Sequence, residues 1–148
     1  ADTTLQTVVK ISPRPVVVVP DKLPTGKNII VAYDGSAQAA RALQLFALSG
    51  IPCDGEVHIV SIHENKLIAA KTADRAVEYL QSHGIKALPH RPDVGSSHAS
   101  VLIEHVRKLD GGLMVMGAFG ESAWKSLFFG STTRRLIQDA GVPLFMSQ

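Results

Sequence analysis

Three glycines and two hydroxyl residues mark the stretch of the chain best suited to chemistry. Residues 117–132 read GAFGESAWKSLFFGST, with Gly117, Gly120, Gly130, Ser131 and Thr132 at the points of interest. Glycine at the end of a buried strand lets the backbone bend and approach a ligand closely. A helix that begins at Ser131 would present free N–H groups and the positive end of its dipole, which suits phosphate. The stretch is neither a Walker A loop nor GxGxxG, so a plain turn followed by a helix cap is the competing interpretation.

A carboxylate at the end of another strand offers a second point of attachment. Asn28–Tyr33 reads as a buried strand and Asp34 follows it, just before a helix. In a doubly wound sheet, ligands bind beyond the carboxyl ends of the strands, where the strand order reverses. Asp34 could accept hydrogen bonds from ribose hydroxyls there, or it could only cap the helix. Ile62, at the end of the strand Val57–Ile62, could give an apolar wall for a flat base, or it could be ordinary core.

These residues need strands and helices that alternate along the chain. Short runs rich in β-branched residues predict strands, and longer segments with an apolar stripe and a capping residue predict helices. The alternation indicates an α/β fold: an open, doubly wound, five-stranded parallel sheet with helices on both faces, which is a Rossmann-like arrangement. The predicted strands are Val16–Val19, Asn28–Tyr33, Val57–Ile62, Lys86–His90, Leu113–Met116 and Leu144–Met146, and the predicted helices are Thr3–Ile11, Ser36–Gly50, Asn65–His83, one capped by Ser96 or Ser97, and Ser131–Ala140.

The first 20 residues stand outside that alternation, because they read as a helix, prolines and a strand. The C-terminus reads in the same way, and one constant shift places Thr4 on Thr132 and Pro15 on Pro143. The match is either chance or a sign that residues 1–20 are the last helix and strand of a preceding copy of the domain. On the second interpretation, residues 21–27 are a linker and residues 28–148 are the domain itself.

Composition excludes several other classes of function. The net charge of +2 is too small to indicate a nucleic-acid or acidic-membrane partner. Cys53 is the one cysteine, so no intrachain disulfide forms and the cytoplasm is the expected location. The histidines lack metal-ligand spacing and no nucleophile elbow occurs. We therefore expect no metal site and no catalytic residues, with slow ATP hydrolysis as the most that an enzyme activity would amount to.

Taken together, the glycine loop, the strand NIIVAYDGS and the ending GVPLFMS resemble the universal stress protein family over about residues 27–147. The loop matches that family's ATP-binding signature, Gly-x2-Gly-x9-Gly-Ser/Thr. The resemblance implies a stress-response domain that binds ATP, with Mg²⁺ carried by the nucleotide, and that regulates how domains or partners associate. It implies the following positions in the site: Ala32, Tyr33, Asp34 and Ile62 toward adenosine, and Gly117, Gly120, Gly130, Ser131 and Thr132 around ribose and phosphates.

The resemblance also bears on association and on an alternative function. In dimers of the family the final strands pair antiparallel, so Val16–Val19 is expected to lie beside Val142–Met146, from its own chain or from a neighbour in a homodimer. Phe119 and Glu121 depart from the family pattern, and Phe128 and Phe129 make the loop apolar. These residues favour the alternative of a nucleotide-free module for interaction and dimerisation. The loop interpretation further predicts that Gly117→Val abolishes nucleotide binding while the domain stays folded.

Overall fold

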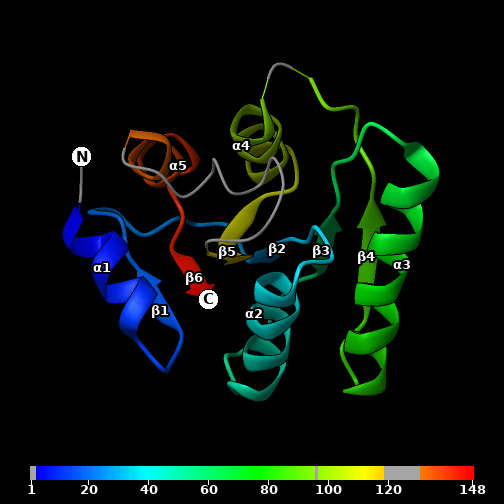
Figure 1. Ribbon diagram of the computed structural model, residues 1–148, viewed down its shortest axis with the longest axis horizontal. Helices are drawn as coiled ribbons and strands as arrows, with labels where there is room; N and C mark the ends of the chain where they lie inside the picture. Colours follow the sequence, from blue (N-terminus) through cyan, green and yellow to red (C-terminus); the bar gives the residue numbers. More distant parts are fainter. Residues whose placement is uncertain (1–2, 96, 119–130) are drawn as a thin grey trace.

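A computed structural model describes residues 3–95, 97–118 and 131–148, and within these the side chains of residues 3, 6 and 131–134 are not described. Helices and strands alternate from β2 onward, as the sequence predicts (Figure 1). The elements in chain order are α1 (Thr3–Ile11), β1 (Val16–Val18), β2 (Asn28–Ala32), α2 (Ala37–Leu48), β3 (Val57–Val60), α3 (Lys66–Ser82), β4 (Ala87–His90), α4 (His98–Lys108), β5 (Gly111–Gly117), α5 (Ser131–Ala140) and β6 (Leu144–Ser147).

The strands form one sheet in the order β1-β6-β5-β2-β3-β4. The pairs β6–β5, β5–β2, β2–β3 and β3–β4 are parallel, and only β1 runs antiparallel, against β6. The predicted doubly wound parallel sheet is therefore confirmed, together with the extra piece at its edge. The strand order reverses between β2 and β5, because the chain moves outward from β2 to β4 and then returns to the other side of β2.

Two layers of helices bury the two faces of the sheet. Alternate residues of β2 point to opposite faces, as the pleat requires: Ile29 and Val31 pack with α2 and α3, whereas Ile30 and Ala32 pack with α4 and α5. In Figure 1, α2 lies below the sheet and α3 at its right beside β4, whereas α4 and α5 lie above it. Both cores are built from fully buried aliphatic side chains, so the sheet is a rigid platform for whatever lies at its edges.

Side-chain caps fix where three of the helices begin. Ser36 accepts a hydrogen bond from the Ala39 amide at the start of α2, and Ser97 does the same for the Ser100 amide in α4. In α3, the Asn65 side chain accepts from the amides of Leu67 and Ile68. Each cap satisfies backbone donors that would otherwise lack a partner.

None of the helices in the described part of the chain combines the length and apolar character needed to cross a membrane.

The N-terminal piece lies where the sequence predicts it. Val16 pairs with Met146, and Val18 pairs with Leu144, in an antiparallel register within the same chain. Of the helix α1, Val9 is buried against the core on the α4 and α5 side. The outer face of this piece is exposed, with Val8 at 43%, Ile11 at 71% and Val17 at 46% of their full exposure. The expected antiparallel pairing with the final strand is thus confirmed for Val16–Val18, which lie beside Leu144–Met146, whereas Val19 lies outside β1.

Candidate functional site

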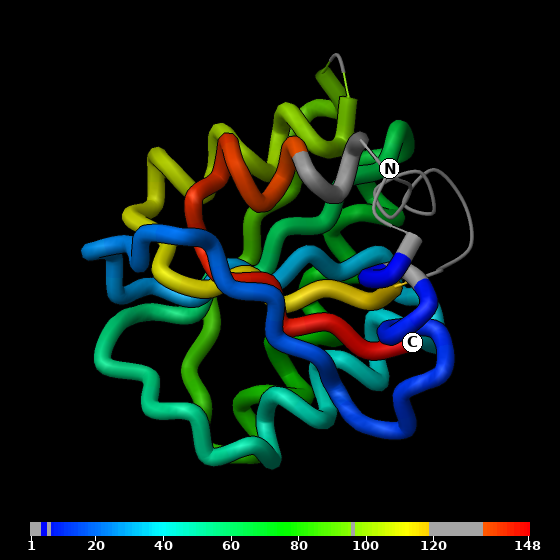
Figure 2. Tube along the Cα trace, turned by 90° about the vertical axis from the view of Figure 1, so that its left-hand side faces the viewer, coloured from blue at the N-terminus to red at the C-terminus, as the bar shows by residue number. Residues whose placement is uncertain are grey.

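The point of strand reversal lies between the ends of β2 and β5. Ala32, the last residue of β2, pairs with Met116, and Gly117 ends β5 one residue later. Figure 2 shows β5 and β6 ending at the same edge of the sheet at which α4 and α5 begin. Because helices start there with free N–H groups, this edge carries the positive ends of several helix dipoles. The topology therefore provides the kind of edge at which doubly wound folds bind ligands.

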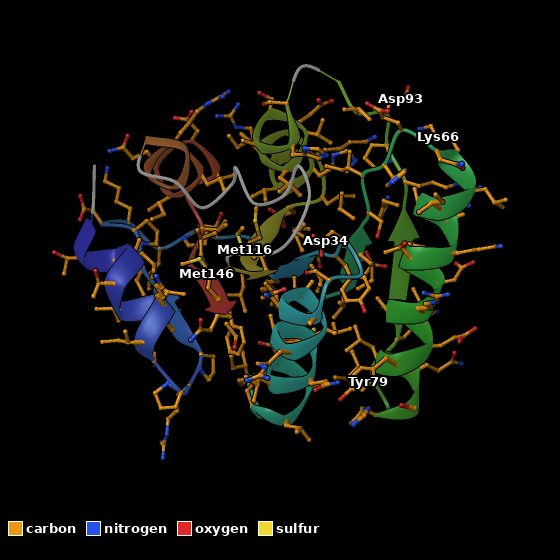
Figure 3. All side chains as sticks on the ribbon, in the orientation of Figure 1. Asp34, Lys66, Tyr79, Asp93, Met116 and Met146 are labelled. Carbon is orange, nitrogen blue, oxygen red and sulfur yellow. The ribbon has the colours of Figure 1, made fainter. Side chains whose placement is uncertain are left out.

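A tight turn holds Asp34 at that edge. Asp34 Oδ1 accepts a hydrogen bond from the Ser36 amide at 2.9 Å, and Ser36 in turn caps α2. Gly35 lies between them at φ +79°, a left-handed conformation that favours glycine. Figure 3 shows Asp34 at the junction of β2 and α2. A carboxylate has about four lone-pair sites, so Asp34 can accept further hydrogen bonds while it holds the turn, and the capping and ligand interpretations are compatible.

Gly117 is glycine for a reason that the sequence does not reveal. A Cβ at this position would lie 2.5 Å from Ala39 N and 2.6 Å from the Gln38 carbonyl carbon, both in the first turn of α2. Real Cβ atoms essentially never come so close to backbone atoms. The end of β5 is thus packed directly on the start of α2, the helix that follows Asp34. The prediction that Gly117→Val leaves the domain folded stays a prediction, and a cost in stability is now expected with it, because the larger side chain would force β5 and α2 apart.

The remaining predicted contacts of adenosine do not share one surface. Ala32 and Ile62 are both buried in the core on the α4 and α5 side, at 2% and 3% exposure. Tyr33 points to the opposite face, into the core beneath α2 and α3. Its main chain is also engaged, since Tyr33 N donates to Val60 O and Tyr33 O accepts from the buried Ser61 hydroxyl at 2.8 Å. Only the backbone of Tyr33, not its ring, borders the edge where Asp34 lies.

Electrostatic contacts connect Asp34 to groups on both faces. Burial raises the pKa of the Tyr33 phenol, and the negative charge of Asp34 raises it further, whereas Arg75 on α3 lowers it. On the other face, burial lowers the pKa of His98, and Asp34 partly offsets this by raising it. His98 is the first residue of α4 and is partly buried. His98 therefore belongs to the surroundings of Asp34, and it was not among the residues predicted from the sequence. Its position could have indicated this, because it directly follows the cap Ser97 on a helix that begins at the carboxyl ends of the strands.

The last part of the predicted site is the glycine loop itself. Helix α5 begins at Ser131 and includes Thr132, as predicted, but the side chains of both lie outside the described part of the structure. Gly120, Gly130 and the aromatic stretch between them also lie outside the described residues. The structure thus brings Asp34, Gly117 and the start of α2 together.

Two other features of the structure bear on possible chemistry. Within residues 3–95, 97–118 and 131–148, no group of three or more His, Cys, Asp or Glu side chains could hold a metal ion. A cavity of about 750 Å³ lies away from Asp34, between α3, β4 and α4, and His90, Asp93, Glu104, His105 and Lys108 are among its lining residues. Its size alone does not make it the nucleotide site, because it lies at the outer edge of the sheet and not at the strand reversal.

Comparison with known sequences identifies related proteins. The sequence model of the family described as Universal stress protein family matches residues 26–147. A universal stress protein of Synechocystis sp. is 28% identical over 142 residues, which is 95% of this chain and 49% of that protein. The chain therefore spans about half the length of this curated relative.

Comparison with solved structures shows the same fold. One universal stress protein from Archaeoglobus fulgidus matches with a TM-score of 0.68 at 23% identity, over 90% of this chain and 49% of that chain. Another from the same organism, solved in complex with dAMP, matches with a TM-score of 0.64 at 20% identity, over 86% of this chain and 98% of that chain. At such identities the likeness establishes the fold and leaves ligands and partners to separate evidence.

Proposed function

Because this chain belongs to the universal stress protein family, we propose that it is a regulatory domain of the stress response that binds an adenine nucleotide, ATP in the first instance. The observation that carries the proposal is the placement of Asp34 at the strand reversal, held by the Ser36 amide beside the start of α2. The dAMP complex of a relative with the same fold adds support. The proposed location is the cytoplasm, in keeping with the single cysteine.

Each proposed contact follows from the position of the residue in the sheet. Asp34 accepts hydrogen bonds from the ribose hydroxyls, and the backbone of Ala32 and Tyr33 borders the base. Ile62 lies beneath them as part of the apolar wall. A ring N–H of His98 would donate to a phosphate or a ribose oxygen near Asp34, since the two residues lie close enough to interact electrostatically. The backbone and hydroxyl groups of the glycine loop would hold the phosphates. The loop residues proposed for this are Gly117, Gly120, Gly130, Ser131 and Thr132.

The chain's own residues fit a nucleotide better than a bare metal ion. The edge carries the Asp34 carboxylate and several helix starts, which suit a ribose and its phosphates. Mg²⁺ would therefore arrive on the nucleotide and be held chiefly by phosphate oxygens, as is usual for this ion. We assign no residue as a general base, so catalysis is at most slow hydrolysis.

The direct test is stabilisation by ATP with Mg²⁺, measured as the rise in the unfolding temperature. A ligand at 100 times its dissociation constant should stabilise the fold by about 2.7 kcal/mol. Asp34→Ala should weaken binding about ten-fold or more, because a hydrogen bond to a charged group contributes about 1.5–3 kcal/mol. Asp54→Ala is the matched control, since Asp54 is exposed and lies at the opposite edge of the sheet, and it should leave binding unchanged.

The alternative function is a nucleotide-free module for interaction and dimerisation. The exposed apolar side chains on α1 and β1 favour it, because they offer a surface for a partner independent of any nucleotide. No rise in unfolding temperature at millimolar ATP would select this alternative. Release of phosphate from ATP above the background rate would instead select an ATPase.

We further propose that the chain is the C-terminal domain of a tandem protein. Residues 1–20 would then be the last helix and strand of a preceding copy, residues 21–27 the linker, and residues 28–148 the domain. The curated relative of about twice the length supports this arrangement. So does β1, whose outer edge has no strand beside it among the described residues, although bare edge strands invite association. In a tandem protein the preceding copy covers that edge and forms a pseudo-dimer; in its absence a second chain could form a homodimer there.

A further inference from the structure

Two histidines on neighbouring strands form a direct pair on the face of the sheet toward α4. His58 lies in β3 and is 4% exposed, and His90 is the last residue of β4. His58 Nδ1 and His90 Nε2 are 2.8 Å apart, and the ring centroids are 5.0 Å apart. The strand register places His90 beside Val60, so the two histidines are diagonal neighbours. This distance is that of a hydrogen bond, and one proton must therefore lie between the two rings.

The pair can accept one added proton without losing its contact. His58 Nε2 is buried and has no hydrogen-bond partner in the described part of the chain, and Glu56 Oε1 lies 3.5 Å from it. A proton added at Nε2 would face that carboxylate, while Nδ1–H continues to donate to His90. A second added proton would place N–H against N–H at 2.8 Å, with two positive charges on adjacent rings. The paired geometry therefore tolerates one imidazolium and opposes two.

Two groups on α4 add to this opposition. The His105 ring centroid is 6.1 Å from that of His90, and His105 Nδ1 lies 2.8 Å from Val101 O. The pKa of His90 is lowered first by burial, and then by His58, His105 and Lys108. The other charged groups that border the adjoining cavity are Arg91, Asp93 and Glu104. Of these, Asp93 is engaged by Lys66 at 2.6 Å (Figure 3), so its charge is already partly compensated.

The pair acts at a weakly attached edge of the sheet. Among the residues that the structure describes, β4 is the outermost strand on its side and pairs with β3 alone. Pro89 within β4 has no N–H and cannot donate to a neighbouring strand. The cavity of about 750 Å³ between α3 and α4 borders β4, so this strand is not fully covered on that side. A side-chain link between β3 and β4 therefore matters more here than it would in the centre of the sheet.

We propose that the His58–His90 pair is a proton-sensitive latch, which holds β4 against β3 at neutral pH and loosens this edge when both rings are protonated in mild acid. The sign follows from linkage. In the unfolded chain each histidine binds a proton at about pH 6.5, whereas the folded pair binds its second added proton only at lower pH. Below pH 6.5 the unfolded state thus binds more protons, and the stability of the fold decreases as the pH falls. The latch does not depend on nucleotide binding at Asp34.

The first test compares unfolding by urea between pH 8 and pH 5 in the wild type and in His90→Gln. The unfolding equilibrium constant should rise by up to about ten-fold per pH unit for each extra proton that the unfolded state binds. The wild type should show this rise below pH 6.5, and His90→Gln should lose it while keeping a polar side chain. His83→Gln is the control, because His83 is an exposed histidine at the end of α3 and is not part of the pair. This variant should keep the wild-type dependence of stability on pH.

The second test uses the wild type alone, so it does not depend on whether a variant folds. Nuclear magnetic resonance of the imidazole rings should show the two rings of the pair taking up their protons in two separate steps, with His90 remaining neutral to lower pH than a free imidazole. Hydrogen-exchange protection of β4 should fall between pH 7.5 and pH 5.5 more than that of β5, after correction for intrinsic exchange. Independent titration of both rings at ordinary values, or equal loss of protection in β4 and β5, would overturn the latch.

Discussion

Substitution of Gly117 by alanine tests how the candidate site is built into the fold. The added Cβ would lie 2.5 Å from Ala39 N, 2.6 Å from Gln38 C and 2.9 Å from Ala39 Cα. Ordinary contact requires about 3.5 Å, so β5 and the first turn of α2 must separate by about 1 Å. All three neighbours are backbone atoms, and no change of rotamer can relieve the contact.

The expected cost follows from two opposing effects. Overpacking of a well-packed core costs about 1–3 kcal/mol, and here α2 must move as a unit with its buried Ala42 and Phe46. Replacing glycine by alanine restricts the unfolded chain and returns about 0.4–1 kcal/mol. The free energy of unfolding should therefore fall by about 1–2 kcal/mol in Gly117→Ala.

The measurement is urea unfolding followed by far-ultraviolet circular dichroism, with Gly111→Ala as the control. Gly111 begins the same strand, but its added Cβ would meet mainly side-chain atoms, Ile30 Cγ1 at 3.0 Å and Val106 Cγ1 at 3.1 Å. These side chains can adjust, so Gly111→Ala should lose less than about 1 kcal/mol. Equal stability of Gly117→Ala and the wild type would refute the close packing of β5 on α2.

Two further predictions concern the edges of the fold. Asn28 joins the starts of β2, β5 and β3, because its Nδ2 donates to Leu109 O at 2.7 Å and its Oδ1 accepts from the Glu56 amide at 2.8 Å. Asn28→Ala should reduce the free energy of unfolding, measured with urea, by about 1–3 kcal/mol. A loss under about 0.5 kcal/mol would contradict this bridging role. Val17→Lys places a charge on the bare edge strand β1. It should raise the dissociation constant of any self-association at least about ten-fold in sedimentation experiments. Leu48→Lys, on the exposed side of α2, is the control and should leave that dissociation constant unchanged.

Most of the sheet could be predicted from the sequence, because each strand and helix carries its own local signal. Helices α1 and α5 begin and end at the predicted residues, and α4 begins after Ser97, one of the two predicted caps. Strand β5 starts at Gly111, before the predicted Leu113. The strand includes Gly111 and Gly112, and residue 112 is glycine because a Cβ there would clash with the Gly26 carbonyl oxygen. Such crowding depends on a distant segment and leaves no periodic pattern in the sequence.

The candidate site was predictable where it depends on strand ends, and less so where it depends on side-chain direction. The order of elements brings Asp34 to the reversal point, and this needs only the topology. The alternation of β2, extended by one residue, places Tyr33 on the α2 and α3 face and Ala32 on the other, so the two side chains cannot share a ligand surface. The His58–His90 pair joins residues 32 positions apart, and a single sequence gives no signal of such a contact.

The contact between Gly117 and α2 means that one glycine serves both the fold and the proposed site. If β5 moves away from the first turn of α2, Ser36 and the Asp34 turn move with that helix, because hydrogen bonds connect them. Loss of ATP binding in Gly117→Ala would then come with loss of stability. Asp34→Asn separates the two effects, since it removes the negative charge of the ligand carboxylate but keeps an oxygen that can accept from the Ser36 amide, and it leaves β5 and α2 in contact. A nucleotide that binds across this turn must draw β5 and α2 together, and in Gly117→Ala this costs binding energy. The same concentration of ATP should therefore stabilise Gly117→Ala less than the wild type, whereas Asn28→Ala should gain as much as the wild type.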